Sequence, residues 1–171
     1  ADFVRSILHY DPETGHFFWK ERPREQFATL NAWAVWNSRL AGKRAANNKA
    51  RYLQIGINGG VYLAHRLAWL YMTGQWPERE IDHINLDRHD NRFSNLRLAS
   101  RKENARNLKV FRSNTSGYKG VCFVKYTGKW QVQIKTDEGR KYLGQFATAE
   151  QAAAVYAAAA ESYHGDFARV C

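Results

Sequence analysis

The segment between Glu80 and Leu108 constrains the fold of this chain more than any other part of its sequence. Two short strand-like stretches flank a long polar loop, and a helical stretch follows them. Ser100 and Glu103 have the spacing of a capping box, in which each side chain bonds to the other residue's backbone N–H at the start of a helix. The sequence therefore predicts a β-β-α arrangement in this segment.

The residues before this segment predict a hairpin and a second helix. Asn58-Gly59-Gly60 tolerates the positive φ of a tight turn and is flanked by strand-like residues 52–57 and 61–63. Apolar residues recur at helical spacing over residues 64–72, and Gly74 ends this pattern. Residues 1–42 are aromatic and irregular, and here the sequence predicts only a turn followed by a short strand, at residues 10–19.

The C-terminal part predicts a three-stranded sheet and a closing helix. Turns that contain glycine separate three strand-like stretches, residues 119–126, 129–136 and 140–146. Thr148 and Gln151 form a second capping-box pattern, and the alanine-rich helix that follows ends near residues 164–165. Residues 109–116 are polar and basic and lack periodicity, which predicts a linker.

Charge and cysteine content narrow the classes of function. The 26 Lys and Arg residues against 16 Asp and Glu give a net charge of +10, and 13 of the 26 lie between Arg92 and Lys141. Such localised charge favours a polyanionic partner. Cys122 and Cys171 form no CxxC pair, so a disulfide framework and a zinc ribbon are not indicated. We expect a cytoplasmic protein with no signal peptide, no membrane segment and no small-molecule cofactor.

The polar loop carries side chains that suit the metal-assisted hydrolysis of phosphodiester bonds. This reaction needs a base to take a proton from water and a cation to neutralise charge on the phosphate. His83 and Asp82 can supply the base and a metal ligand, although neighbours on a strand point to opposite faces. The alternative is an ordinary hydrogen-bonded surface pair, with the asparagines of the loop serving turns and caps.

The set Asp82-His83, Asn95 and Asn104 resembles the HNH endonucleases, in particular the phage and intron-encoded homing branch. Asn95 follows His83 by 12 positions, and Asn104 follows it by 21. The resemblance implies that His83 is the general base and that Asn95 orients it. It also implies that Asp82 and Asn104 hold a single divalent cation.

The same resemblance implies a ββα-metal fold (a His-Me finger) in residues 79–108, inside a nuclease domain of residues 1–108. Carboxylate and amide ligands suit Mg²⁺, for which Mn²⁺ can substitute. The implied substrate is double-stranded DNA, and the implied products carry 5′-phosphate and 3′-hydroxyl ends. A monomer would nick one strand, whereas a homodimer could cut both.

Four further polar residues have weaker patterns. His89 and Asn91 lie in the loop, where an exposed side chain is the commoner outcome. His65 and Arg66 resemble the His-Arg pair that precedes Asp-His in the same family. Since His65 falls on a predicted helix, we expect it to be structural or to contact phosphate rather than to be catalytic.

The C-terminal part resembles the Apetala/ethylene-response-factor DNA-binding domain. The resemblance rests on Ser116-Gly-Tyr-Lys-Gly-Val121, Gly128-Lys-Trp130, Leu143-Gly-Gln-Phe146 and the helix after Thr148. It implies that residues 117–171 form a domain that lays a three-stranded sheet in the major groove. This chain has Cys122 and Val124 where the plant domains present arginines, so the plant target sequence is not inherited.

Basic, amide and aromatic side chains of this sheet and of the preceding helix are expected to contact DNA. Gln133 is favoured over Gln131 as a reader of adenine, on the argument that alternate residues of a one-sided sheet face inward. The alternative is a small sheet that packs on the nuclease and adds non-specific charge. The expected DNA-binding residues are Lys119, Lys125, Lys129, Gln133, Lys135, Arg140, Tyr142, Arg101 and Arg106.

Together these patterns predict an α+β protein in which a ββα-metal nuclease is followed by a basic linker and by a three-stranded antiparallel sheet packed on one helix. The expected function is site-selective, metal-dependent cleavage of DNA by a phage or mobile-element homing endonuclease, with restriction and packaging roles left open. A non-catalytic, sequence-specific DNA-binding regulator is the alternative. An RNA-binding protein is a third hypothesis, because exposed aromatic side chains stack on bases.

Overall fold

The computed structural model describes residues 1–46, 50–108, 110 and 113–169. The chain has the predicted α+β fold and divides into two compact units, Ala1–Ala99 and Ser100–Cys171. The predicted linker, residues 109–116, contains positions outside the described part of the chain. The predicted three-part division therefore stays a prediction.

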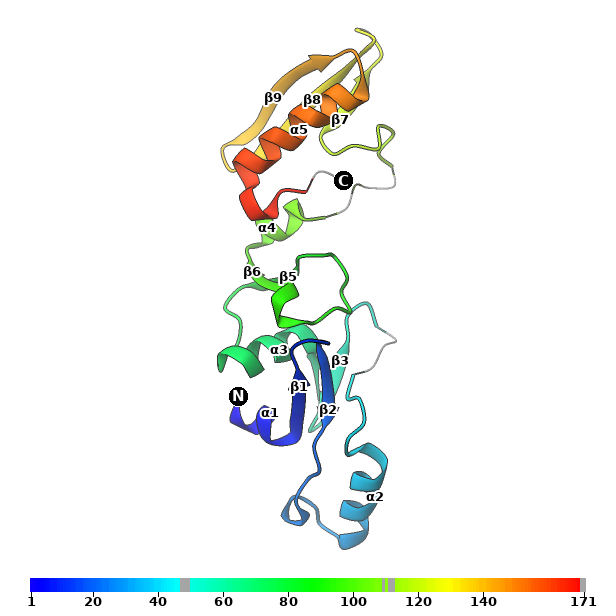
Figure 1. Ribbon diagram of the computed structural model, residues 1–171, viewed down its shortest axis with the longest axis vertical. Helices are drawn as coiled ribbons and strands as arrows, with labels where there is room; N and C mark the ends of the chain where they lie inside the picture. The colour runs from blue at the N-terminus through cyan, green and yellow to red at the C-terminus, as the bar shows by residue number, and fades with distance from the viewer. Residues whose placement is uncertain (47–49, 109, 111–112, 170–171) are drawn as a thin grey trace. The chain divides into compact units, whose positions relative to one another are not determined.

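The first unit contains three antiparallel pairs of short strands, β1 with β2, β3 with β4, and β5 with β6 (Figure 1). Its elements are α1 (Asp2–Ile7), β1 (Leu8–Asp11), β2 (His16–Trp19), η1 (Arg24–Gln26), α2 (Leu30–Leu40), β3 (Gln54–Ile57), β4 (Gly60–Leu63), α3 (Ala64–Thr73), β5 (Glu80–His83), η2 (Phe93–Asn95) and β6 (Leu96–Ala99).

The helix α3 and the β1–β2 and β3–β4 pairs share the core of this unit. Leu67 of α3, Ile55 of β3 and Phe17 of β2 are almost fully buried in it. The predicted hairpin is confirmed, since Asn58 has a φ of 49° at the turn between β3 and β4. The predicted helix end is also confirmed, because Gly74 adopts a left-handed conformation and its N–H bonds to the carbonyl of Leu70.

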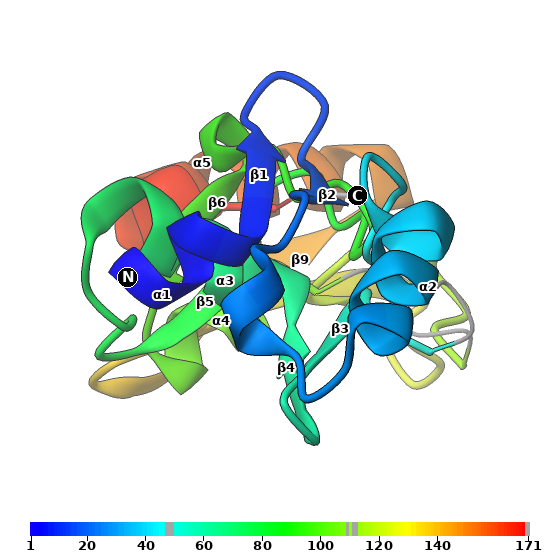
Figure 2. The same ribbon diagram turned by 90° about the horizontal axis from the view of Figure 1, so that it is seen from below.

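The N-terminal region contains more structure than its sequence indicates. The predicted turn and strand are present, but β1 precedes the turn, and two helices, α1 and α2, flank the hairpin on opposite sides of β1 (Figure 2). Thr29 caps α2 by accepting a bond from the N–H of Ala32. α2 buries none of its residues, and the ring of Trp36 contacts those of Trp19 and Phe27.

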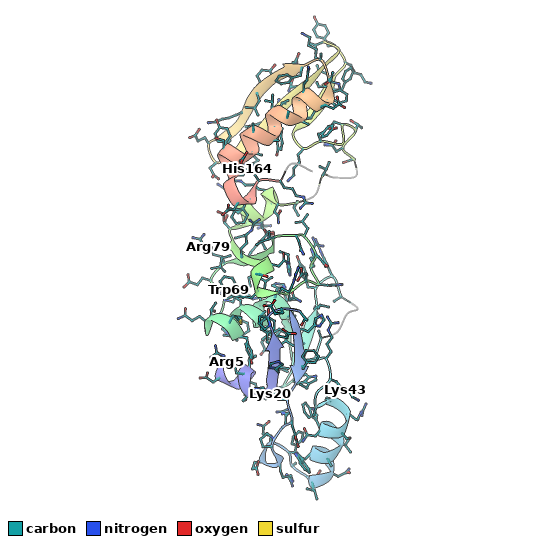
Figure 3. The ribbon with its side chains drawn as sticks, viewed as in Figure 1. Arg5, Lys20, Lys43, Trp69, Arg79 and His164 are labelled. Atoms are coloured by element: carbon teal, nitrogen blue, oxygen red, sulfur yellow. The ribbon has the colours of Figure 1, made fainter. Side chains whose placement is uncertain are left out.

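Polar contacts connect α1 to its neighbours in the first unit. Arg5, labelled in Figure 3, donates from Nε and Nη2 to the carbonyl oxygen of Tyr71 at 3.1 and 2.6 Å. Lys20 Nζ donates to the carbonyl oxygen of Arg5 at 2.8 Å. These bonds fix α1 and the end of β2 to the last turn of α3.

The second unit is a three-stranded antiparallel sheet, in the order β7-β8-β9, with a helix along one face (Figure 1). Val132 and Ile134 of β8 are buried against Ala152 and Tyr156 of the helix. The predicted capping box of Ser100 is confirmed at the start of α4. The elements of this unit are α4 (Arg101–Arg106), β7 (Val121–Val124), β8 (Lys129–Thr136), β9 (Gly139–Phe146), α5 (Ala149–His164) and η3 (Gly165–Phe167).

We expect Gly120→Ala to destabilise the second unit strongly. Gly120 has a φ of 65°, and an added Cβ would lie 2.3 Å from ring carbons of Tyr156 and 2.4 Å from the carbonyl oxygen of Gln133. The backbone strain and the overlap together cost about 3 kcal/mol or more. Thermal unfolding followed by near-UV circular dichroism measures this loss.

Gly128→Ala is the matched control, since Gly128 has a φ of 66° and nothing lies within 4 Å of an added Cβ. This variant should lose only about 1 kcal/mol of folding stability, because alanine is strained in the left-handed conformation. Equal melting temperatures for the two variants would contradict the packing argument at Gly120.

Candidate active site and DNA-binding face

Two polar residues of β5 are buried side by side along the chain. Asp82 is 3% exposed and His83 is 4% exposed. In the ladder with β6, Asp82 lies opposite Arg97 and His83 lies opposite Leu96. Because neighbours on a strand point to opposite faces, the two side chains have different partners. Asp82 bonds to Arg97, and His83 bonds to Asn91.

Asp82 forms a buried ion pair. Arg97 donates from Nε at 2.9 Å and from Nη2 at 2.7 Å, both to Oδ2 of Asp82. The Asp82 side chain is 4% exposed and that of Arg97 is 17% exposed. The attraction between the two charges offsets part of the cost of burying this carboxylate.

His83 is oriented by an amide. Its Nε2 lies 3.1 Å from Oδ1 of Asn91, a residue that is fully buried. An amide oxygen only accepts hydrogen bonds, so this contact assigns the proton to Nε2 and leaves Nδ1 as the nitrogen that can accept one. Burial lowers the pKa of His83, and the bond to Asn91 opposes that shift. The effect of burial is the larger, so the net lowering of the pKa favours the neutral imidazole near pH 7.

Two further rings surround His83. The ring of His65 meets it edge to face at 5.1 Å between centroids, and the ring of Tyr52 lies 5.2 Å from His65 and 6.2 Å from His83. Burial lowers the pKa of His65 to about 3, with His83 and Arg66 adding to the shift. His65 is thus a neutral ring packed against His83. Its buried Nδ1 has no hydrogen-bond partner among the described residues.

Asn95 lies in the same loop and bonds to other residues than His83. Its Oδ1 accepts from the N–H of Asn85 at 3.0 Å, and its Nδ2 donates to Oδ1 of Asn85 and to the carbonyl oxygen of Asp90. Arg92 bonds to Asp90 and lowers the pKa of that carboxyl group to about 2. These contacts close the loop. The role of Asn95 in orienting His83 stays a prediction. In the structure it is Asn91 whose Oδ1 accepts a hydrogen bond from Nε2 of His83.

The exposed His89 lies outside this cluster. Its Nε2 is 3.3 Å from the carbonyl oxygen of Ala50. No group of three or more His, Cys, Asp or Glu side chains gathers as a metal site in the described part of the chain. The donor set predicted from the sequence has one carboxylate, from Asp82, and one amide oxygen, from Asn104. This chemistry fits a hard cation that retains waters and takes phosphate oxygens as further ligands.

Comparison with known proteins decides the family. The family model for HNH endonucleases matches residues 62–106. The chain is also similar to Protein 3.8 of Escherichia phage T7, with 34% identity over 106 residues, which are 61% of this chain and 87% of that protein. The chain belongs to the HNH endonuclease family. Membership implies nuclease activity on DNA with a divalent metal ion.

The HNH match contains the residues predicted to form the active site, Asp82, His83, Asn95 and Asn104, as well as the amide of Asn91. Residues 1–61 and 107–171 lie outside it. The ethylene-response-factor identity of the C-terminal sheet is therefore not tested. No solved structure matches the chain. None of the described helices is long and apolar enough to cross a membrane.

The face of the C-terminal sheet opposite α5 carries several of the residues expected to bind DNA. Gln133 of β8 pairs with Tyr142 of β9, and Lys135 pairs with Arg140. Val132 and Ile134, which alternate with them, are buried. The argument that favoured Gln133 over Gln131 is wrong, because residues two apart on a strand point to the same face. Both glutamines lie on the open face.

The other expected DNA-binding residues of the second unit are more scattered. Lys119 donates from Nζ to the carbonyl oxygen of Arg106 at 2.6 Å. Arg106 pairs with Asp137 at 2.9 Å and is mostly buried. Both side chains hold α4 within this unit rather than extending from the open face of the sheet. Lys125, Lys129 and Arg101 are exposed.

Arg97 and Tyr52 escaped the sequence argument, which also did not predict the contact of His65 with His83. Arg97 could have been found from register, because it is the partner of Asp82 once β5 and β6 are paired in a ladder. The contacts of His65 and Tyr52 with His83 could not have been found in this way, since they depend on how α3 and the residue stretch before β3 pack against β5. Their aromatic character alone is equally typical of a core.

Proposed function

We propose that this protein is a Mg²⁺-dependent endonuclease that cuts double-stranded DNA, with His83 as the general base. The observation that carries the proposal is the pair of buried polar residues on β5 inside the HNH match. Asp82 forms a buried ion pair with Arg97, and the contact with Asn91 favours one tautomer of His83. Asp82 and Asn104 would hold the metal ion, for which Mn²⁺ can substitute.

Each side chain has a defined part in the proposed reaction. His83 accepts the proton of the attacking water at Nδ1, because Nε2 carries a proton that is donated to Asn91. Asn95 keeps the loop closed around this position. The metal ion, when bound, neutralises charge on the phosphate and on the leaving oxygen. The proposed products are a 5′-phosphate and a 3′-hydroxyl.

The open face of the β7-β8-β9 sheet is the proposed DNA-binding surface. It combines two basic residues, Lys135 and Arg140, with the amide of Gln133 and the exposed ring of Tyr142. Basic groups supply affinity for phosphate, and amides and rings contact base edges. Joined in one chain with the nuclease, such a surface raises the local concentration of DNA at the active site and makes cleavage site-selective.

A phage or mobile-element role is the biological setting we propose, with homing as the preferred form and the bacterial cytoplasm as the place of action. The relative from phage T7 supports it. A monomer that carries one such site would nick one strand, and a homodimer would cut both.

Incubation of supercoiled plasmid with the purified protein tests the proposal. Nicked or linear product should form with Mg²⁺ and be absent with chelator. End-labelling should find 5′-phosphate termini. Tight, sequence-specific binding without cleavage, in Mg²⁺ and in Mn²⁺ and across several DNA substrates, would identify a DNA-binding regulator instead. Preference for single-stranded RNA over duplex DNA would identify an RNA-binding protein.

We expect Lys135→Ala to reduce the salt dependence of DNA binding. Losing one phosphate contact should lower the slope of log K against log salt concentration by about one. Fluorescence anisotropy over a salt series measures this slope. The matched control is Lys141→Ala, because Lys141 alternates to the helix side of β9, where its Nζ bonds to Glu138 and lies over the ring of Tyr163. Equal effects of the two variants would refute DNA binding by the open face.

A further inference from the structure

The β1–β2 hairpin contacts the loop that orients His83. The hydroxyl of Tyr10, on β1, donates to the carbonyl oxygen of Asn91 at 2.7 Å. Tyr10 is 2% exposed and Asn91 is fully buried, so water does not compete for this bond. The hairpin lies outside the HNH match, in the region whose purpose the sequence did not reveal.

The turn of the hairpin lies directly against the same loop. Gly15 has a φ of 70°, and a Cβ added there would lie 2.4 Å from the carbonyl carbon of Asn91 and 2.4 Å from the backbone nitrogen of Arg92. Only a residue without a side chain allows this approach. The backbone of the turn therefore limits where the Asn91 peptide can lie.

The turn is itself held in one conformation. The Asp11 carboxylate accepts bonds from the N–H of Glu13 at 3.0 Å and from the hydroxyl of Thr14 at 2.6 Å. The N–H of Gly15 bonds to the carbonyl oxygen of Asp11 at 2.8 Å. Such an Asx turn stabilises the backbone locally without help from the core. It presents Gly15 to the loop as a fixed surface.

Asn91 contacts both the hairpin and His83. Its backbone is held by Tyr10 and Gly15, and its Oδ1 lies 3.1 Å from Nε2 of His83. Moving the Asn91 peptide would move the acceptor that selects the tautomer of His83. A change of tautomer would place the proton on the nitrogen that must accept one.

We propose that the β1–β2 hairpin is a positioning element of the nuclease, which fixes the tautomer of His83 through Tyr10, Gly15 and Asn91. The inference rests on the proposed function, because it assigns His83 the role of base. It makes Asn91 a positioning residue and gives residues 10–15 a purpose beyond packing.

The first test replaces the acceptor. Asn91→Leu keeps the approximate volume and removes the amide, whereas Asn91→Asp keeps an oxygen acceptor. We expect Asn91→Leu to lower kcat about 100-fold, as loss of an orienting partner does elsewhere, with KM and DNA affinity within about twofold. Asn91→Asp should restore most of kcat.

The second test is spectroscopic and needs neither DNA nor metal. Nitrogen-15 NMR of the His83 ring should show the Nε2–H tautomer in the intact chain and a mixture of tautomers in Asn91→Leu. Tyr10→Phe removes only a hydroxyl. It should change the ratio of the His83 tautomers in the same direction but by less, and should lower kcat about five- to tenfold. Tyr71→Phe, which removes the hydroxyl of a ring whose centroid lies 5.7 Å from that of Tyr10, is the control and should change neither the tautomer nor kcat.

The outcomes separate this inference from the proposed function. If the protein does not cut DNA but the His83 tautomer shifts in Asn91→Leu and Tyr10→Phe, the nuclease proposal fails and the structural link stands. If the protein cuts DNA and the tautomer is unchanged in both variants, the link is overturned. A fall in kcat without a change of tautomer also overturns it. Should Asn91→Leu not fold, Tyr10→Phe and its control decide the question.

Discussion

His83→Ala should abolish cleavage and leave DNA binding intact. General bases contribute about 10²- to 10⁴-fold to the rates of such reactions, so we expect kcat to fall by about a thousandfold or more. His83 is 4% exposed, so its ring is not part of a surface that meets DNA before cleavage. Single-turnover cleavage of plasmid, beside equilibrium binding of the same DNA, measures the two effects separately.

His89→Ala is the control for this variant. His89 lies in the same loop and is exposed, with its ring nitrogen near the carbonyl oxygen of Ala50. Its replacement should change kcat by less than about twofold, since exposed side chains away from the site contribute little. If His83→Ala weakened DNA binding as much as it slowed cleavage, His83 would be a binding residue and the general-base role would be lost.

Asp82→Asn should also stop cleavage, for two separable reasons. The variant removes the carboxylate expected to hold the metal ion, which should lower activity about a thousandfold and raise the Mg²⁺ concentration required. It also breaks the buried ion pair with Arg97, whose side chain is 17% exposed, which costs about 3 kcal/mol of folding stability. Activity over a Mg²⁺ series, together with thermal unfolding, measures both losses.

Arg97→Met separates the two losses, because it breaks the same ion pair from the other side. It leaves the Asp82 carboxylate in place. We expect a comparable loss of folding stability, about 3 kcal/mol, and cleavage within about tenfold of the unaltered protein below its melting temperature. If activity in both variants fell only in proportion to the unfolded fraction, the function of Asp82 would be structural and metal binding would have to be assigned elsewhere.

Local signals in the sequence predict much of this fold. The turn at Asn58, the helix end at Gly74 and the cap at Ser100 depend on interactions within four residues, and all three are present. α2 carried a weaker local signal, the cap at Thr29. None of its residues is buried in the core; Trp33 Nε1 bonds to the carbonyl oxygen of Arg22, and the ring of Trp36 contacts Trp19 and Phe27.

The candidate site was predicted less completely than the fold, because its contacts join residues that lie far apart in the sequence. The spacing of Asp82, His83 and Asn95 along the chain could be read directly from the sequence. Which asparagine meets His83 could not, because Asn91 and Asn95 are equally typical of loops. Their hydrogen-bond partners in the folded chain distinguish them, because His83 contacts Asn91 while Asn95 bonds to Asn85 and Asp90. Asn91 is buried because Tyr10 and Gly15 cover it, and both are more than 75 positions away in the sequence.

The hydrogen bond between Tyr10 and Asn91 spans 81 positions. A contact of that sequence separation forms only after a large part of the chain has closed on itself, and the entropy of that closure must be offset by the core. A fragment trimmed to residues 62–106 would keep the whole family signature and still lack the donor and the glycine that limit the Asn91 peptide. We therefore expect such a fragment of this chain to be inactive in a cleavage assay although it contains Asp82, His83, Asn95 and Asn104.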